Sequence, residues 1–162
     1  MDIYETIKAI YTPCELICTE PFMDKNSIDY GGCSLIVNGK HVIFRIAKTT
    51  PTKLGQFVTL WKRVNGSLPL PFHEDDLVDL FVVNVQKDAH FGQFIFPKSA
   101  LIKHSVMSSK NKKGKCAMRV YHPLDIVTST QAIHTQKWQL KYFQSFTMNQ
   151  TSNTNRIRHF YS

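Results

Sequence analysis

The chain of 162 residues lacks any long hydrophobic run. Its uninterrupted apolar runs are only a few residues long, such as Phe81-Val82-Val83, whereas a helix that crosses a bilayer needs about 20 apolar residues. The first residues, Met1 to Glu5, carry acids where an export signal carries basic residues. The sequence therefore predicts a cytoplasmic protein without a membrane partner, and nothing in it indicates an obligate protein partner.

Signatures of common enzymes and of metal sites are also missing. The chain has no GxSxG, GxxxxGKS/T or HExxH motif. Its histidines are scattered and its cysteines include no CxxC pair, so buried thiols are a better interpretation than a zinc site. We therefore expect no cofactor and assign no catalytic residue. The cysteines are Cys14, Cys18, Cys33 and Cys116.

Acidic residues are absent from one long segment and almost absent from another. Residues 33–72 hold six Lys and Arg residues and no acid, and residues 98–162 hold eleven against one acid. The formal net charge is +8. Because solvated surfaces usually mix the two signs, we expect the two segments to form one basic face that binds a polyanion, nucleic acid first. The alternative is an ordinary solvated surface with unpaired lysines.

Periodicity and turn signals predict a single domain over residues 1–162, with a core at roughly 29–146 and a polar tail at 147–162. Helices are expected at 2–11 and 128–146, where Asp2 with Glu5 and Thr128 with Gln131 could form capping boxes. The Asn38-Gly39 pair indicates a hairpin over 34–48. Further strands are expected at 56–63, 77–85, 93–96 and 117–121, with a disordered loop at 105–115. The predicted fold class is α/β (α+β), a central mixed sheet of roughly five or six strands flanked by helices.

Residues 44–63 combine cations, hydroxyls and aromatic side chains most densely. The cations and hydroxyls could contact phosphates if they converge. Trp61 could stack on a base, but its alternation with other apolar residues favours a place in the core. The predicted phosphate contacts in this segment are Arg45, Lys48, Thr50, Lys53, Lys62 and Arg63.

A second basic group follows residue 97. Its lysines could track a phosphate backbone or simply keep a loop soluble, and the sequence favours neither interpretation. Its members are Lys98, Lys103, His104, Lys110, Lys112, Lys113, Lys115 and Arg119. On the predicted helix that follows, Gln131, Gln136, Lys137 and Lys141 could face the same groove, although a wet polar face is the commoner explanation for each.

The acidic residues 74–76, with Asp79, are the one stretch where carboxylates gather closely enough to suggest a divalent metal. Asp79 opens a predicted strand, which suits a metal ligand in a nuclease. Asp75 and Asp76 equally suit a turn or a helix cap. We favour the structural interpretation and keep Asp79 as a weak candidate for binding Mg²⁺.

Together these motifs resemble the MepB family over roughly residues 29–143. The resemblance is carried by the FRxAKxTPxKxGQFVxxWKR-like run at 44–63, by GQFIFPK at 92–98, by RVY at 119–121 and by QAxxxQKWQxxYF at 131–143. It implies a small intracellular bacterial protein, in some genomes encoded beside a multidrug efflux pump and its repressor. It also implies a fold similar to the PD-(D/E)xK restriction-endonuclease core and nucleic-acid binding as the activity.

The sequence departs from the nuclease pattern where catalysis would need it. Such an enzyme holds Mg²⁺ with an Asp and with an Asp or Glu two residues before a Lys, but no (Asp/Glu)-x-Lys tripeptide occurs, and Ile46 stands at that place before Lys48. We therefore expect binding of DNA or RNA without cleavage. The alternatives are a Mg²⁺- or Mn²⁺-dependent nuclease whose diverged site uses Asp79 with Asp29 or Glu20, and a protein-interaction or sensing module associated with multidrug efflux.

Overall fold

The structure is a computed structural model that describes residues 1–147 and 153–162. Its main sheet has six strands in the order β1-β2-β3-β8-β9-β11. They are β1 (Phe22–Met23), β2 (Cys33–Val37), β3 (Lys40–Ile46), β8 (Leu80–Lys87), β9 (His90–Pro97) and β11 (Phe143–Phe146). Strands β3 and β8 pair in parallel, and the other neighbours of this sheet pair antiparallel. The predicted fold class, a central mixed sheet with flanking helices, is therefore confirmed.

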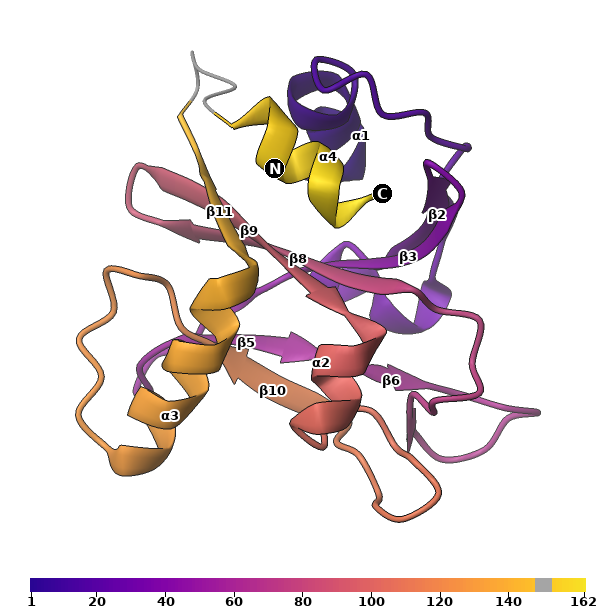
Figure 1. Cartoon of the computed structure of the whole chain (residues 1–162). Coiled ribbons are helices and arrows are strands. Elements are labelled where there is room, and N and C mark those ends of the chain that lie inside the picture. The colour runs from indigo at the N-terminus through magenta and orange to yellow at the C-terminus, as the bar shows by residue number, and fades with distance from the viewer. Residues whose placement is uncertain (148–152) are drawn as a thin grey trace.

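The two ends of the chain cover one face of this sheet (Figure 1). The elements of this layer are α1 (Ile3–Thr6), its π-helical continuation (Ile7–Tyr11) and α4 (Thr154–Phe160). Ile3, Ile10 and Ile157 are buried against the sheet residues of the same core. The Tyr11 and Tyr161 hydroxyls lie 2.8 Å apart inside it. The chain therefore closes its first core with segments from both termini.

A smaller sheet and two helices cover the opposite face (Figure 1). The sheet has the order β10-β5-β4, and β6 pairs with β7 beside it. These elements are β4 (Lys48–Thr49), β5 (Gln56–Thr59), β6 (Trp61–Lys62), β7 (Leu70–Pro71), α2 (Lys98–Lys103), β10 (Ala117–Val120) and α3 (Thr130–Gln139). The described part of the chain also contains two 3₁₀ segments, Lys25–Tyr30 and Leu140–Tyr142. A second core, which includes Val58, Phe81 and Trp138, lies between this layer and the main sheet.

Local signals in the sequence are confirmed where a few adjacent residues decide the conformation. Asn38 and Gly39 both have positive φ, at 48° and 80°, as a type I′ turn requires, and they join β2 to β3 in the expected antiparallel register. The capping box at the first helix is also present, because the Asp2 carboxylate accepts a hydrogen bond from the Glu5 amide and the Glu5 carboxylate accepts one from Asp2.

Longer predicted elements are wrong at their ends. The strand expected at 56–63 divides into β5 and β6 at Leu60. The helix expected at 128–146 begins with Ser129 as its cap and gives way after the 3₁₀ turn to β11, an edge strand of the main sheet. The loop at 105–115 is not a disordered segment, because Val106 and Met107 are buried in the second core.

The polar tail predicted at 147–162 needs a correction. Residues 148–152 lie outside the described part of the chain. Beyond them, α4 buries Ile157 and is followed by the fully buried Tyr161. Arg158 also donates hydrogen bonds to the Cys14 carbonyl and the Glu15 carboxylate. The end of the chain is therefore part of the core rather than an appendage.

Removing the apolar anchor of α4 tests this assignment. We expect Ile157→Ala to lower the free energy of unfolding by about 2 kcal/mol or more, because the side chain is 1% exposed and its loss leaves a cavity. Urea denaturation followed by circular dichroism measures the change. The matched variant Asn155→Ala, at an exposed position of the same helix, should change it by less than about 0.5 kcal/mol. Equal effects from the two variants would contradict the packing of α4 described above.

Candidate nucleic-acid interface

The predicted phosphate contacts do not form one continuous trough. Some of these side chains are held by carboxylates or carbonyls of the fold, and others are exposed. Those that line a hollow are divided between two separate ones. Arg45 is the clearest correction, since its side chain is 1% exposed. Its Nη2 donates to Asp24 Oδ2 at 2.9 Å and its Nη1 donates to the Phe44 carbonyl. Burial lowers the pKa of Arg45, and the Asp24 carboxylate opposes that shift. Arg45 therefore holds the 3₁₀ segment to β3 and does not offer a surface charge.

Lys62 and Lys98 are also engaged in the fold. Lys62 forms an ion pair with Asp76, and Lys98 Nζ donates to the carbonyls of Glu74 and Asp76 at 2.8 and 2.6 Å. Asp76 also accepts a hydrogen bond from the His73 amide. Glu74 and Asp76, in the acidic segment that follows residue 72, therefore bind Lys62 and Lys98, two of the predicted phosphate contacts. The role of this segment here is structural.

Gln136 and Trp61 are also placed differently from the prediction. Gln136 donates to the carbonyls of His122 and Asp125 at 2.9 and 3.1 Å, so it closes a loop and is not free to contact a base. Trp61 is half-buried and belongs to neither core. The Arg63 guanidinium lies over its ring, 5.2 Å from the centroid. The preference for Trp61 as a core residue was therefore wrong.

Arg45, Lys62, Arg63 and Trp61 all line one hollow of about 500 Å³ together with Lys25. Asp24 lines it as well, and two of the four cations already have carboxylate partners. This hollow is consequently less positive than its count of basic residues suggests.

A second hollow of about 500 Å³, here called the basic groove, lies between α3, the end of α2 and β10. Lys53, Lys115 and Arg119 line it, with His104 and His134, and no Asp or Glu is among its lining residues in the described part of the chain. Lys53 comes from the acid-free segment 33–72, and the others come from segment 98–162. The groove therefore brings Lys53, alone of segment 33–72, beside cations of segment 98–162.

Arg119 fixes the loop that carries Lys53. Its Nη2 donates to Thr50 Oγ1 at 2.8 Å, and its Nη1 donates to the carbonyls of Leu54 and Gly55, both at 3.3 Å. Thr50, another predicted phosphate contact, thus serves as a partner of Arg119. Because a guanidinium has five N–H donors, Arg119 can hold this loop and still present N–H groups to the groove.

Glycine is required at position 55 for two reasons. Its φ is +78°, and a Cβ there would lie 2.8 Å from Tyr121 Cε1. The TPxKxG part of the motif therefore brings the backbone close against Tyr121, which lines the basic groove. This close approach places Lys53 beside β10.

At one wall of the groove, His104 at the end of α2 meets His134 and Trp138 of α3. His104 stacks on Trp138, with centroids 4.1 Å apart and planes 8° apart, and the His134 ring lies 6.3 Å from His104. Burial, followed by the charges of Lys103, His134 and Lys141, lowers the pKa of His104 below its usual value of 6.5. His104 is therefore neutral at pH 7 and adds a positive charge only in more acidic solution.

Sequence reasoning missed Tyr121, His134 and Trp138 as groove residues. The i,i+4 spacing of His134 and Trp138 could have indicated that they share a helix face. Lys48 and Lys137 are exposed but do not line the groove, and the Lys48 ammonium lies over the Tyr30 ring, 4.9 Å from its centroid.

The fit of a divalent metal to the predicted acidic site is poor. Asp79 Oδ2 accepts a hydrogen bond from the His41 amide at 2.8 Å. Within residues 1–147 and 153–162, no group of three or more His, Cys, Asp or Glu side chains could hold a metal ion. Asp79, Asp29 and Glu20 are therefore not gathered in such a group. The same residues contain no helix long and apolar enough to cross a membrane.

The fold and the groove define a small mixed α/β domain with a basic hollow beside its smaller sheet. The MepB-like family model matches residues 24–145, so the chain belongs to the MepB-like family. One solved structure, entitled "Crystal Structure of MepB", is similar to it over 93% of this chain and 100% of that chain, with 28% sequence identity and a TM-score of 0.79. No curated protein matches the sequence. The family predicted from the sequence is thereby confirmed.

Comparing two glycines tests the geometry of the groove loop. Gly55→Ala should lower the free energy of unfolding by about 2–4 kcal/mol, because positive φ costs an L-residue roughly 1–2 kcal/mol and the Cβ collides with Tyr121. Gly66 has φ +72°, and a Cβ added at Gly66 would have no atom within 4 Å. Gly66→Ala should therefore show only the conformational cost of a positive φ. Urea denaturation of both variants measures the difference. Similar losses in the two would argue against the close approach at Tyr121.

Proposed function

We propose that this protein binds DNA or RNA through the basic groove, in the cytoplasm, without cleaving it. The observation that carries the proposal is that Lys53, Lys115 and Arg119, from two acid-poor segments, line one groove without an acid among its described lining residues. Cations gathered in this way bind a phosphate backbone by displacing its counterions. Membership of the MepB-like family supports the proposal through the nucleic-acid binding that this resemblance implies.

The groove suits contact with the backbone rather than recognition of a sequence. Lys53 and Lys115 are exposed, so their long side chains can follow phosphates of different spacing. Arg119 is held by the 50–55 loop and presents a fixed direction to an anion. Gln131, which is exposed on α3 and lines the groove, can contact bases, but one amide carries little sequence information.

Charge reversal in the groove is the direct test. Lys53→Glu with Lys115→Glu should weaken binding of a fluorescent oligonucleotide more than tenfold near 100 mM salt. It should also reduce the slope of log affinity against log salt by roughly 1.5, because each lost phosphate contact removes about 0.7–0.9. Fluorescence anisotropy with single-stranded and double-stranded DNA and RNA, at several salt concentrations, gives both quantities.

The control variant has the same net charge as the groove variant Lys53→Glu with Lys115→Glu. Lys8→Glu with Lys40→Glu changes two cations that line none of the described hollows. It should retain most of the affinity if the groove, rather than total charge, is responsible. Equal loss in the two double variants, or no binding by the unmodified protein at any salt concentration, would refute the proposal.

The groove should also bind more tightly in acid. Burial lowers the pKa of His104 below its usual value, so the imidazole is mainly neutral at pH 7 and gains its positive charge as the solution becomes more acidic. Affinity for the oligonucleotide should therefore rise between pH 7 and pH 5.5. In His104→Phe, which preserves a ring against Trp138 but cannot be protonated, the rise should be smaller. An identical pH profile in this variant would remove His104 from the interface.

The same samples separate binding from cleavage. Plasmid DNA and RNA are incubated with the protein and Mg²⁺ or Mn²⁺, and the products are resolved on gels, beside an Asp79→Ala variant. We expect both proteins to leave the substrates intact. Metal-dependent cleavage that disappears in Asp79→Ala would instead establish the diverged nuclease.

A further inference from the structure

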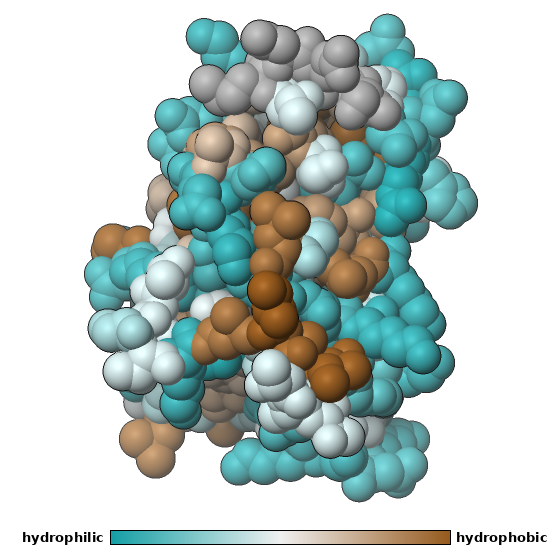
Figure 2. Space-filling view, turned by 90° about the vertical axis from the view of Figure 1, so that its left-hand side faces the viewer, coloured by the Kyte–Doolittle hydropathy of each residue, from teal (hydrophilic) through white to brown (hydrophobic). Residues whose placement is uncertain are grey.

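A separate pocket of about 280 Å³ opens on another part of the molecule. It lies where the amino terminus, β4 and the β8–β9 turn meet, and none of its lining residues also lines the basic groove. Figure 2 views the side that carries the β8–β9 turn and β11, where apolar surface gathers amid hydrophilic side chains. The two sites can therefore be tested independently.

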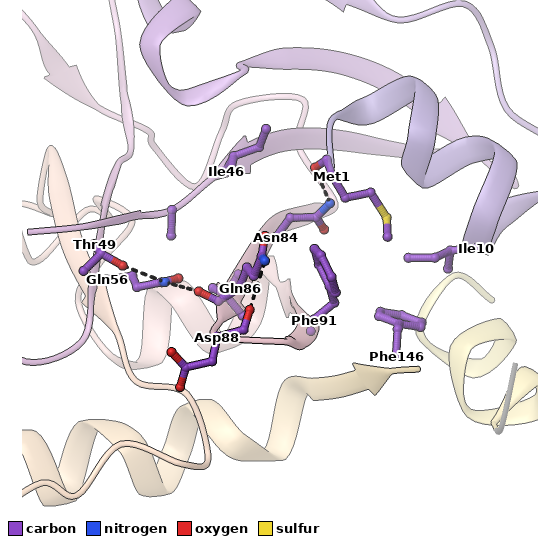
Figure 3. A pocket seen from close by; sticks show the side chains of 13 residues that line it. Met1, Ile10, Ile46, Thr49, Gln56, Asn84, Gln86, Asp88, Phe91 and Phe146 are labelled. Carbon is purple, nitrogen blue, oxygen red and sulfur yellow. Dashed lines mark hydrogen bonds between the residues drawn. The ribbon is translucent and has the colours of Figure 1, made fainter. Parts of the chain in front are cut away.

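The pocket has an apolar end and a polar end (Figure 3). Met1, Ile10, Phe91 and Phe146 stand at the apolar end. Two of these are aromatic rings, and the flexible Met1 side chain can adapt to different shapes. This end therefore favours the hydrocarbon or aromatic body of a ligand over a strongly hydrated group.

The polar end offers mainly hydrogen-bond acceptors. Gln56 is only 8% exposed, and its Nε2 donates to Thr49 Oγ1 at 3.2 Å and to the Gln86 carbonyl at 2.5 Å. Its Oε1 is buried and has no hydrogen-bond partner among the described residues. Because buried carbonyl groups normally have a donor, this end is suited to a group that brings N–H bonds.

The charge of the Asp88 carboxylate determines which kind of hydrogen-bond donor the pocket favours. Asp88, at the polar end (Figure 3), is the one ionisable side chain among the described residues that line the pocket. Its carboxylate has no ion-pair partner within the described residues. The amino terminus of Met1, which also lines the pocket, lies 3.8 Å from the Glu5 carboxylate. An anionic ligand would meet Asp88 unfavourably, whereas a cation would be attracted.

We propose that this pocket binds a small organic amine whose apolar body lies against Phe91 and Phe146 and whose ammonium group lies at the Asp88 end. This is a second binding site of opposite charge preference to the basic groove. It does not depend on nucleic-acid binding, because phosphate would be repelled here.

A matched set of probes tests the proposal on the full-length chain, with any tag at its carboxyl end so that Met1 remains free. The probes are 4-phenylbutylamine, 4-phenylbutan-1-ol and 4-phenylbutanoate, which share one apolar body and differ in charge. Ligand-detected NMR titration should give a dissociation constant of roughly a millimolar for the amine, as expected for a ligand of this size. The carboxylate should bind at least tenfold more weakly than the amine, with the alcohol between them.

Two substitutions place the binding in this pocket. Asp88→Asn suits the backbone, because Asp88 has φ 53° and asparagine tolerates that region. It should weaken the amine about tenfold and leave the alcohol unchanged. Thr49→Trp should block all three probes, because Thr49 is exposed and lines the pocket. Thr52→Trp, an exposed control outside the described hollows, should block none.

Each of these measurements has an outcome that contradicts amine binding in this pocket. No saturable binding of the amine, equal affinity for amine and carboxylate, or unchanged affinity in Asp88→Asn or Thr49→Trp would overturn the proposal. The groove variant Lys53→Glu with Lys115→Glu should bind the amine normally, and Asp88→Asn should bind oligonucleotide normally. A failure of one site is therefore distinguishable from a failure of the other.

Discussion

Strand β8 is the element on which both layers of the protein depend, because its two faces are buried in different cores. Leu80 and Val82 belong to the core closed by the chain ends, whereas Phe81 and Val83 belong to the core beneath the smaller sheet. The strand also makes the parallel pairing with β3. Parallel neighbours need a long connection between them, and here residues 47–79 supply it. That connection contains β4, β5 and the loop with Lys53, so the place of Lys53 in the basic groove is a consequence of this pairing.

A buried polar network continues from the same strand. Asn84 Nδ2 donates to Thr6 Oγ1 at 2.8 Å, and Asn84 Oδ1 accepts from Gln93 Nε2 at 2.8 Å. Gln93 Oε1 accepts a longer bond from the Tyr161 hydroxyl, which also meets that of Tyr11. Buried polar groups favour a single arrangement when they satisfy one another. This chain of contacts explains how two short terminal helices are held in a defined place, and it also positions Met1, whose carbonyl accepts from Asn84.

The sequence predicted those features that neighbouring residues determine. The Asn38-Gly39 turn and the Asp2 cap need only a few adjacent residues, and the hydrophobic pattern of β8 and β9 identifies them without knowledge of their partners. The fate of a charged side chain could not be predicted in this way. Arg45 is paired with Asp24 and Lys62 with Asp76, across 21 and 14 positions of the chain. A segment without acids therefore does not imply cations without partners, because folding brings the acids of other segments to them.

This distinction changes what the net charge of +8 means for function. Arg45, Lys62 and Lys98 are held by carboxylates or carbonyls of the fold. A phosphate that bound one of these cations would compete with that carboxylate or carbonyl. The ammonium groups of Lys53 and Lys115 make no such contact in the described part of the chain, so a polyanion can bind these exposed charges without breaking a contact of the fold. The acids are therefore not simply opponents of the basic groove. Asp24 and Asp76 pair with Arg45 and Lys62, two cations that the fold needs, whereas Lys53, Lys115 and Arg119 line the basic groove without an acid among its described lining residues. Asp88 lies apart from that groove and lines the second pocket, so the two hollows differ in the sign of their charged lining residues.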